Sequence, residues 1–282
     1  MVQGIGNLWV LCPKQRQADQ ASTPLPGNQS IIDTAYLTIS VDDGHPTDLR
    51  TAELLARFDL KATFYIPARN PERAVMPEEL VREIAQKFEV GAHTYNHAPL
   101  KGLAIDVMRR ELADGKAWLE DALGDQVIAF CYPRGKFDAR VAAETKEVGF
   151  LGARTCLFHL NCFPRDPFRW GLSTHAYSHS ARIHFQHALL EGNYRGLRSF
   201  VTTFRMVKDW VQNFKLAVRD VEKNGGIAHL YFHSWEIEEQ DQWGKLADLL
   251  GFLSRKRSLR PTTNGELFRI HDHWRVLNQP SP

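Results

Sequence analysis

Strand-like apolar runs and amphipathic helical segments alternate along the chain from Ala35 to about residue 155. The apolar runs are short and rich in β-branched and aromatic residues, and the segments between them carry apolar residues at helical spacing. Strands are expected at residues 35–41, 61–66, 88–92, 126–131 and 150–155, with helices at 47–58, 77–87, 105–123 and 138–147. Because neighbouring parallel strands need a crossover connection, this alternation predicts an α/β fold with a parallel sheet, open or closed into a barrel.

The remaining segments are less regular. Residues 156–198 are rich in Phe, Arg and His, and we expect one strand near 170–174 with long connections. A helix is expected at 200–223, a strand at 227–233 and a final helix at 242–255. Residues 1–34 include a stretch rich in Gln, Pro, Ser and Gly and are expected to form an N-terminal arm or linker, leaving 35–282 as one domain.

Composition excludes several classes of protein. The chain has 282 residues, of which 43% are hydrophobic, and its net charge of +2 gives no general attraction for nucleic acid. No apolar run approaches the ~20 residues of a transmembrane helix, and no basic segment precedes the short apolar patch at the N-terminus, so we expect no secretory signal. Cys12, Cys131, Cys156 and Cys162 lack paired spacing, which predicts free thiols and a cytoplasmic protein.

Polar side chains stand at three of the expected strand ends, namely Asp42 with Asp43, His93 with His97, and His233. The carboxyl ends of parallel strands form the ligand-binding face, so these side chains should meet there. Two adjacent carboxylates repel each other, which a bound cation would compensate; a solvated turn with one helix cap is the alternative. One Asp and two His form a recognised ligand set for a catalytic divalent metal.

Other histidines are expected to have structural roles. His175 and His179 repeat the spacing of four, but no carboxylate-bearing strand precedes them and they are not expected at a strand end, so we interpret the pair as non-functional. His229 should be a buried histidine with its hydrogen bonds satisfied, His45 should lie in an exposed turn, and residues 271–273 should form a C-terminal tail without function.

Three motifs carry a resemblance to a known family. Val-Asp-Asp-Gly at 41–44, His-Thr-Tyr-Asn-His at 93–97 and Tyr-Pro-Arg-Gly at 132–135 resemble, in this order, the motifs of NodB-homology polysaccharide deacetylases, carbohydrate esterase family 4. The resemblance covers roughly residues 35–250, apart from the irregular middle. It implies a distorted (β/α) barrel of about seven parallel strands, a divalent metal that is usually zinc, and removal of acetyl groups from sugars.

The resemblance also implies roles for individual residues. Asp43, His93 and His97 would bind the metal, and Asp42 would be the general base that takes a proton from metal-bound water. The backbone N–H of the residue after the motif's proline would hold the oxyanion, and a late histidine would protonate the leaving amine. These two positions are Arg134 and His233.

Substrate contacts are expected from the third motif and the last strand. Trp235 is placed to stack on a sugar ring, with a loop tryptophan covering the barrel mouth as the alternative. The residues expected to bind substrate are Tyr132, Pro133, Leu230, Tyr231 and Trp235.

The chain also departs from the family pattern. Cys131 stands where the family commonly has an arginine that pairs with the catalytic base, and Arg134 stands where an aromatic residue is usual. Arg154 is a candidate for the missing cation, with a surface ion pair as the alternative. The fourth family motif has no convincing counterpart; Glu236 is either the partner that orients His233 or a solvated charge.

These observations predict a metal-dependent carbohydrate deacetylase, a hydrolase of carbon–nitrogen bonds other than peptide bonds. The expected substrate is an N-acetylated sugar or glycan precursor. A hydrolase of the same fold that acts on a non-sugar amide is one alternative, and a catalytically silent glycan-binding barrel is another. The presence of both Asp42 and His233 argues against silence, because a purely structural metal site needs neither.

Overall fold

The computed structural model describes residues 31–277. The expected N-terminal arm therefore lies almost entirely outside the described residues, as does Cys12. The short 3-10 helix η2 (Ile31–Asp33) leads into the first strand.

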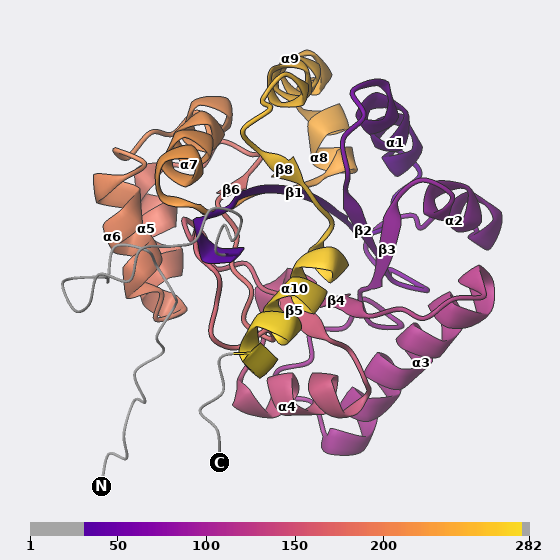
Figure 1. The fold of residues 1–282 in the computed structure, drawn as a ribbon. Helices are drawn as coiled ribbons and strands as arrows, with labels where there is room; N and C mark the ends of the chain where they lie inside the picture. Colours follow the sequence, from indigo (N-terminus) through magenta and orange to yellow (C-terminus); the bar gives the residue numbers. More distant parts are fainter. Residues whose placement is uncertain (1–30, 278–282) are drawn as a thin grey trace, which may run out of the picture.

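Seven parallel strands form a single curled sheet in the spatial order β5-β4-β3-β2-β1-β7-β6, which confirms the predicted barrel (Figure 1). A parallel bridge joins Arg154 of the edge strand β5 to Trp170, which precedes the other edge strand, β6. A short additional strand, β8 (Arg260–Pro261), pairs with the beginning of β1. The seven strands are β1 (Ala35–Asp42), β2 (Thr63–Ile66), β3 (Glu89–Ala92), β4 (Ala129–Cys131), β5 (Gly152–Arg154), β6 (Thr174–His175) and β7 (Gly226–His233).

Helices surround the strands and bury their apolar faces against them, as Val81 and Ile84 of α2 do. The expected helices between the first five strands are all present, and the helix expected at 105–123 has those bounds. The helices on the outside of the sheet are α1 (Asp48–Arg57), α2 (Glu78–Ala85), α3 (Ile105–Leu123), α4 (Ala139–Glu147), α7 (Trp210–Asn224), α8 (Ser234–Glu239) and α9 (Trp243–Ser254).

A helix that the sequence did not predict, α10 (Asn264–Leu277), lies across the barrel opening seen in Figure 1. At its start the Asn264 N–H donates to Thr63 Oγ1 at the beginning of β2, and the Gly265 N–H donates to Glu89 at the beginning of β3, both at 2.9 Å. The helix therefore covers the end of the barrel where the strands begin, and the carboxyl ends lie at the opposite opening. Residues 271–273 belong to this helix rather than to a tail, and His271 is buried with Nε2 2.7 Å from the Pro164 carbonyl oxygen.

The middle of the chain also differs from the prediction. It contains α5 (Ala181–Leu190) and α6 (Tyr194–Thr202), and the helix expected at 200–223 is divided between α6 and α7. The strand expected near 170–174 is reduced to β6 and the bridge at Trp170. Periodicity missed α5 because Leu189 and Leu190 are exposed, although Ser180 is an N-cap that accepts a hydrogen bond from the Ile183 N–H.

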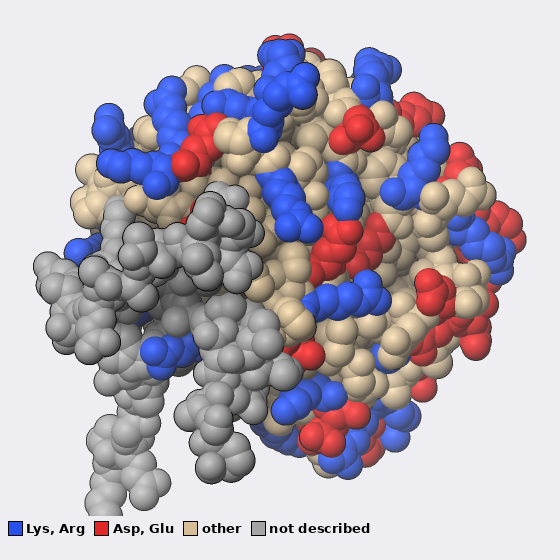
Figure 2. All heavy atoms as spheres, in the orientation of Figure 1, with Lys and Arg blue, Asp and Glu red and all other residues tan. Residues whose placement is uncertain are grey.

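The charges on one face and the lengths of the helices bear on the class of protein. Acidic and basic side chains are mixed over the face shown in Figure 2. No helix within residues 31–277 is long and apolar enough to cross a membrane.

Candidate active site

The two adjacent carboxylates lie where β1 ends in a sharp turn. Asp43 and Gly44 both have positive φ, 81° and 63°. A Cβ atom at position 44 would lie 2.6 Å from Ile66 Cγ2, so only glycine fits beside β2. The turn leaves Asp42 and Asp43 almost completely buried, with 2% and 3% of their surfaces exposed. The solvated-turn alternative is therefore wrong.

The two histidines of the second motif lie on a turn that is fixed to α3. Asn96 donates from its backbone N–H and its Nδ2 to the Glu111 carboxylate, at 2.9 and 2.8 Å. Thr94 has a φ of 62°, and its Oγ1 accepts from the Ala98 N–H. A Cβ atom at Gly115 of α3 would be 2.7 Å from the Thr94 carbonyl carbon, so this glycine lets the helix and the turn approach.

Asp43, His93 and His97 converge as the sequence predicted. Asp43 Oδ1 lies 3.2 Å from His97 Nε2 and 3.7 Å from His93 Nε2. The Cys131 carbonyl oxygen is 2.8 Å from His93 Nδ1, which fixes the proton on Nδ1 and leaves Nε2 facing the carboxylate. Burial lowers the pKa of His93 to about 4, so the imidazole is neutral at neutral pH.

The donor set fits a divalent metal ion. Asp43 Oδ1 is buried and makes no hydrogen bond of good geometry with the described residues. Its Oδ2 accepts from Trp235 Nε1 at 2.9 Å, so one carboxylate oxygen is held and the other faces two imidazole nitrogens. One carboxylate and two neutral imidazoles are the ligands of many catalytic zinc sites.

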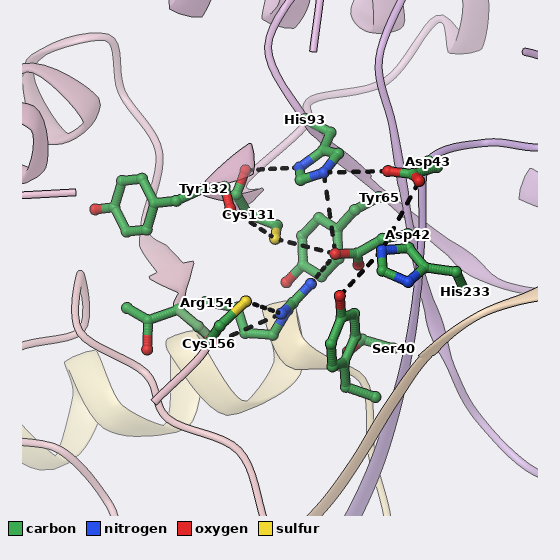
Figure 3. A network of polar contacts seen from close by, with 12 residues as sticks. Ser40, Asp42, Asp43, Tyr65, His93, Cys131, Tyr132, Arg154, Cys156 and His233 are labelled. Carbon is green, nitrogen blue, oxygen red and sulfur yellow. Dashed lines mark hydrogen bonds and ion pairs between the residues drawn. The ribbon is translucent and has the colours of Figure 1, made fainter. Parts of the chain in front are cut away.

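Asp42 is paired with a buried arginine from a neighbouring strand. Arg154 Nη2 contacts Asp42 Oδ2, and the Arg154 and Asp42 side chains are 0% and 3% exposed (Figure 3). Burial would raise the pKa of Asp42, but the Arg154 guanidinium and the nearby imidazoles hold it below its usual value. The surface ion pair considered for Arg154 is therefore wrong, and the structure places this arginine at the carboxylate.

Strand register explains how Arg154 reaches this position. Cys131 on β4 is paired with Arg154 on β5, so the arginine is one strand away from the position that the family pattern assigns to it. Cys131 Sγ is 3.5 Å from Asp42 Oδ2, and the Arg154 guanidinium lies 4.2 Å from the centroid of the Tyr231 ring.

His233 at the end of β7 is held by Glu236. Their Nδ1 and Oε2 atoms are 2.8 Å apart, and Glu236 is largely buried, so it is not a solvated charge. Burial opposes protonation of His233, but the hydrogen bond with Glu236 and the charge of Asp43 raise its pKa to about 9. The Tyr231 hydroxyl lies 3.0 Å from His233 Nε2 on the other side of the ring.

His175 is a neighbour of this site that the sequence did not identify. Its Nε2 is 2.8 Å from the same Glu236 oxygen, and its Nδ1 is 3.0 Å from His179 Nε2. His175 ends β6, so the expectation that it lacks a strand-end position is wrong. The signal was weak because β6 has only two residues.

Two other histidines take structural positions. His229 is fully buried with Nε2 2.8 Å from Ser40 Oγ, as predicted. His45 is half-buried and its Nδ1 is 2.7 Å from Thr47 Oγ1, so it is less exposed than expected. Cys131 and Cys156 are free thiols, as predicted.

Several residues expected to contact substrate lie elsewhere. Tyr132 is fully buried, points away from the carboxylates in Figure 3 and donates from its hydroxyl to the Phe168 carbonyl oxygen. Pro133 is buried as well. Leu230 belongs to the core between sheet and helices, because alternate residues of a strand face opposite sides, and Tyr231 faces the site instead. Tyr132, Pro133 and Leu230 are thus buried in this structure, and their expected contacts with substrate stay predictions.

Trp235 makes contacts that support the metal-binding carboxylate, and its expected contact with a sugar stays a prediction. Besides its bond to Asp43, its ring stacks on the His233 ring at 5.1 Å, and the Arg73 guanidinium lies 3.8 Å from its centroid. These contacts make Trp235 a support for Asp43.

Comparisons with known proteins agree with this site. The family model of polysaccharide deacetylases matches residues 32–153, which include the first three motifs. This segment of the chain is therefore similar to the polysaccharide deacetylases that the three motifs resemble. A curated protein similar to this chain, a peptidoglycan-N-acetylglucosamine deacetylase from Bacillus cereus, is 27% identical over 144 residues, 50% of this chain. The match spans 62% of that relative's length.

Solved structures share the fold of this chain. A putative polysaccharide deacetylase from Mycobacterium smegmatis aligns with a TM-score of 0.56 and 16% identity over 98% of this chain and 99% of its own. A family 4 acetyl xylan esterase from Clostridium thermocellum, in complex with a cobalt ion, aligns with a TM-score of 0.52 and 15% identity over 83% of this chain and 91% of its own.

Proposed function

We propose that this chain uses a divalent metal ion, with zinc as the first choice, to hydrolyse the N-acetyl group of an N-acetylated sugar or glycan precursor. The observation that carries the proposal is the convergence of Asp43, His93 and His97 beside Asp42, a carboxylate that Arg154 keeps ionised. A barrel that only bound glycan would have no need of a buried carboxylate maintained in this way.

Asp43, His93 and His97 would hold the metal ion. When bound, such an ion supplies Lewis acidity, which lowers the pKa of a water molecule and polarises a carbonyl group. Asp42 accepts the proton of the attacking water, and its Oδ1, which has no hydrogen-bond partner among the described residues, is the atom available for it.

The leaving group and the oxyanion are served by other residues. His233, with a pKa raised to about 9 by Glu236 and Asp43, is protonated at neutral pH and donates its proton to the leaving amine. The backbone N–H of Arg134 stabilises the oxyanion, at a turn where Arg134 has a φ of 56°.

The cytoplasmic location expected from the free thiols stays a prediction.

The test combines metal content with acetate release. Plasma mass spectrometry should find about one divalent ion per wild-type chain and none in His93→Ala/His97→Ala. Asp42→Asn should keep the ion but lose acetate release from N-acetylglucosamine oligomers by roughly 10²–10⁴-fold, the usual contribution of a general base. Asp121→Asn, an exposed carboxylate on α3, is the matched control and should behave as wild type.

Two results would contradict the proposal. A wild-type chain that takes up neither zinc nor cobalt would exclude the hydrolytic metal site. Full acetate release by Asp42→Asn would show that another group is the base.

A further inference from the structure

The exposed large apolar side chains are concentrated in one pair of helices. Within residues 31–277, seven large apolar residues are exposed, and all but Leu151 belong to α5, α6 or the turn after α6. Leu190 at the end of α5 and Tyr194 at the start of α6 are the most exposed, with 85% and 68% of their surfaces accessible. The six residues in this region are Ile183, Leu189, Leu190, Tyr194, Val201 and Met206.

These side chains share the outward faces of the two helices. The helices α5 and α6 pack against each other and lie side by side at the edge of the molecule (Figure 1). Tyr194 and Val201 are seven residues apart on α6, so they lie on one side of it, two turns from each other. Ile183 and Leu190 have the same spacing on α5. The apolar residues therefore form a shared outward surface, which is typical of an interaction site.

Basic side chains lie between the apolar ones. Residues 180–208 contain five basic residues and one acidic residue, although the whole chain has a net charge of only +2. Arg198 lies four residues after Tyr194 and three before Val201, so its cation is on the apolar face of α6. Four basic residues of the segment are exposed and form no ion pair with a described residue, namely Arg182, Arg198, Arg205 and Lys208. We call the six apolar and these four basic residues the α5–α6 surface.

The one acidic residue of the segment, Glu191, does not neutralise this charge. Its Oε2 is buried, and burial raises the pKa of the carboxyl to about 7, so it is partly protonated at neutral pH. The α5–α6 surface is therefore both apolar and positively charged.

This combination fits the interface of an anionic lipid bilayer. Apolar side chains can enter the boundary of the acyl chains, while the flexible stems of arginine and lysine keep the cations at the lipid phosphates. A second copy of the chain fits poorly, because a symmetric dimer through this surface would place basic residues opposite each other. Residues 1–30 contain two basic residues and one acidic residue, so they supply no excess negative charge.

We propose that the α5–α6 surface binds an anionic lipid bilayer, with Leu190 and Tyr194 in the headgroup region and the four basic residues at the phosphates. The attachment is peripheral and reversible, since few apolar side chains enter the lipid. The inference goes beyond the proposed deacetylase function and does not depend on it, because no residue of the α5–α6 surface belongs to the proposed active site.

The test measures binding of the full chain to lipid vesicles by flotation. The wild type should float with vesicles of phosphatidylcholine and phosphatidylglycerol, and much less with phosphatidylcholine alone. High salt should release it, because salt screens the cations. Leu190→Ser should lower the partition coefficient roughly tenfold through lost apolar burial, and Arg198→Gln roughly fivefold through the lost charge.

Matched controls make the same substitutions away from the α5–α6 surface. Leu151→Ser changes the one exposed large apolar residue of 31–277 outside it, and Arg257→Gln changes an exposed arginine in the turn after α9. Both variants should keep the partition coefficient within about twofold of the wild type. Circular dichroism checks that every variant keeps the wild-type fold.

Several results would overturn the inference. Absence of wild-type binding to the phosphatidylglycerol vesicles would exclude a lipid surface, and unchanged binding by Leu190→Ser and Arg198→Gln would place the lipid contact elsewhere. Dimerisation of the wild type without lipid, lost in Leu190→Ser, would assign the surface to a second copy. Binding of polyadenylate that is lost in Arg198→Gln but kept in Leu190→Ser, without binding of vesicles, would assign it to nucleic acid.

Discussion

Replacing Arg154 with methionine tests the central electrostatic feature of the site. Methionine keeps much of the side-chain volume but leaves Asp42 buried without its cation. Removing one partner of a buried ion pair costs about 3–5 kcal/mol, or roughly 10²- to 5 × 10³-fold in the unfolding equilibrium. Arg154 and Asp42 are 0% and 3% exposed, so little solvent screening reduces this value.

The cost should depend on pH in a defined direction. Arg154 lowers the pKa of Asp42 below the ordinary 3.8, so the ion pair stabilises the wild type above pH 3.8, and this stabilisation is lost as the pH falls through the folded-state pKa. In Arg154→Met, burial is left to raise the pKa of Asp42, and the variant becomes less stable as the pH rises above 3.8. The difference between wild type and variant should therefore be largest near neutral pH and shrink toward pH 4.

The assay is urea denaturation of metal-free protein near pH 7 and pH 4, for Arg154→Met, Asp42→Asn and the double variant. The double variant should be more stable than the sum of the two single losses of unfolding free energy predicts, because both substitutions remove the same Arg154–Asp42 ion pair. Cys131→Arg in the Arg154→Met background should recover part of the loss, since residues 131 and 154 are register partners. Two results would refute the dependence of Asp42 on Arg154. One is a loss of unfolding free energy below about 1 kcal/mol for Arg154→Met at pH 7. The other is an equal loss for Arg154→Met in the wild type and in the Asp42→Asn background.

Two further predictions concern single carboxylates. Glu236→Gln should lower kcat with little change in KM. It should also move the basic limb of the kcat–pH profile to lower pH, because Glu236 helps to raise the pKa of His233. A basic limb at the wild-type pH would show that Glu236 does not act through His233. Burial raises the pKa of Glu191 from 4.5 to about 7, so the folded chain binds the proton more tightly and the wild type should lose stability relative to Glu191→Gln as the pH rises from about 4.5 to 7. After allowance for solvent screening, this loss of unfolding free energy should be at most about 2 kcal/mol by urea denaturation. Glu83→Gln, at an exposed position, is the control. A difference in stability between wild type and Glu191→Gln that does not change with pH would contradict the prediction.

Local sequence patterns determined most of the barrel. Period-2 and period-3.6 patterns identified the strands and helices from Ala35 to Arg154, because each element there buries one continuous face against its neighbours. The same reasoning failed for α5, whose apolar residues are partly exposed, and for the two-residue β6. Neither presents the periodic burial that a sequence pattern can report.

The sequence by itself also determined which residues meet at the carboxyl ends of the strands. Asp42, Asp43, His93, His97 and His233 could be placed together because parallel strands all end at the same opening of the barrel. That inference needs no knowledge of register or side-chain direction.

Only the tertiary structure decided which side chains complete the site. Arg154 pairs with Asp42 across 112 positions, and His175 shares Glu236 with His233 across 58 positions of chain. Conversely, Leu230 is one residue from Tyr231 yet faces the opposite side of the sheet. Such contacts depend on strand register and on how connections of variable length return to the barrel, and neither is encoded in the spacing of residues along the chain.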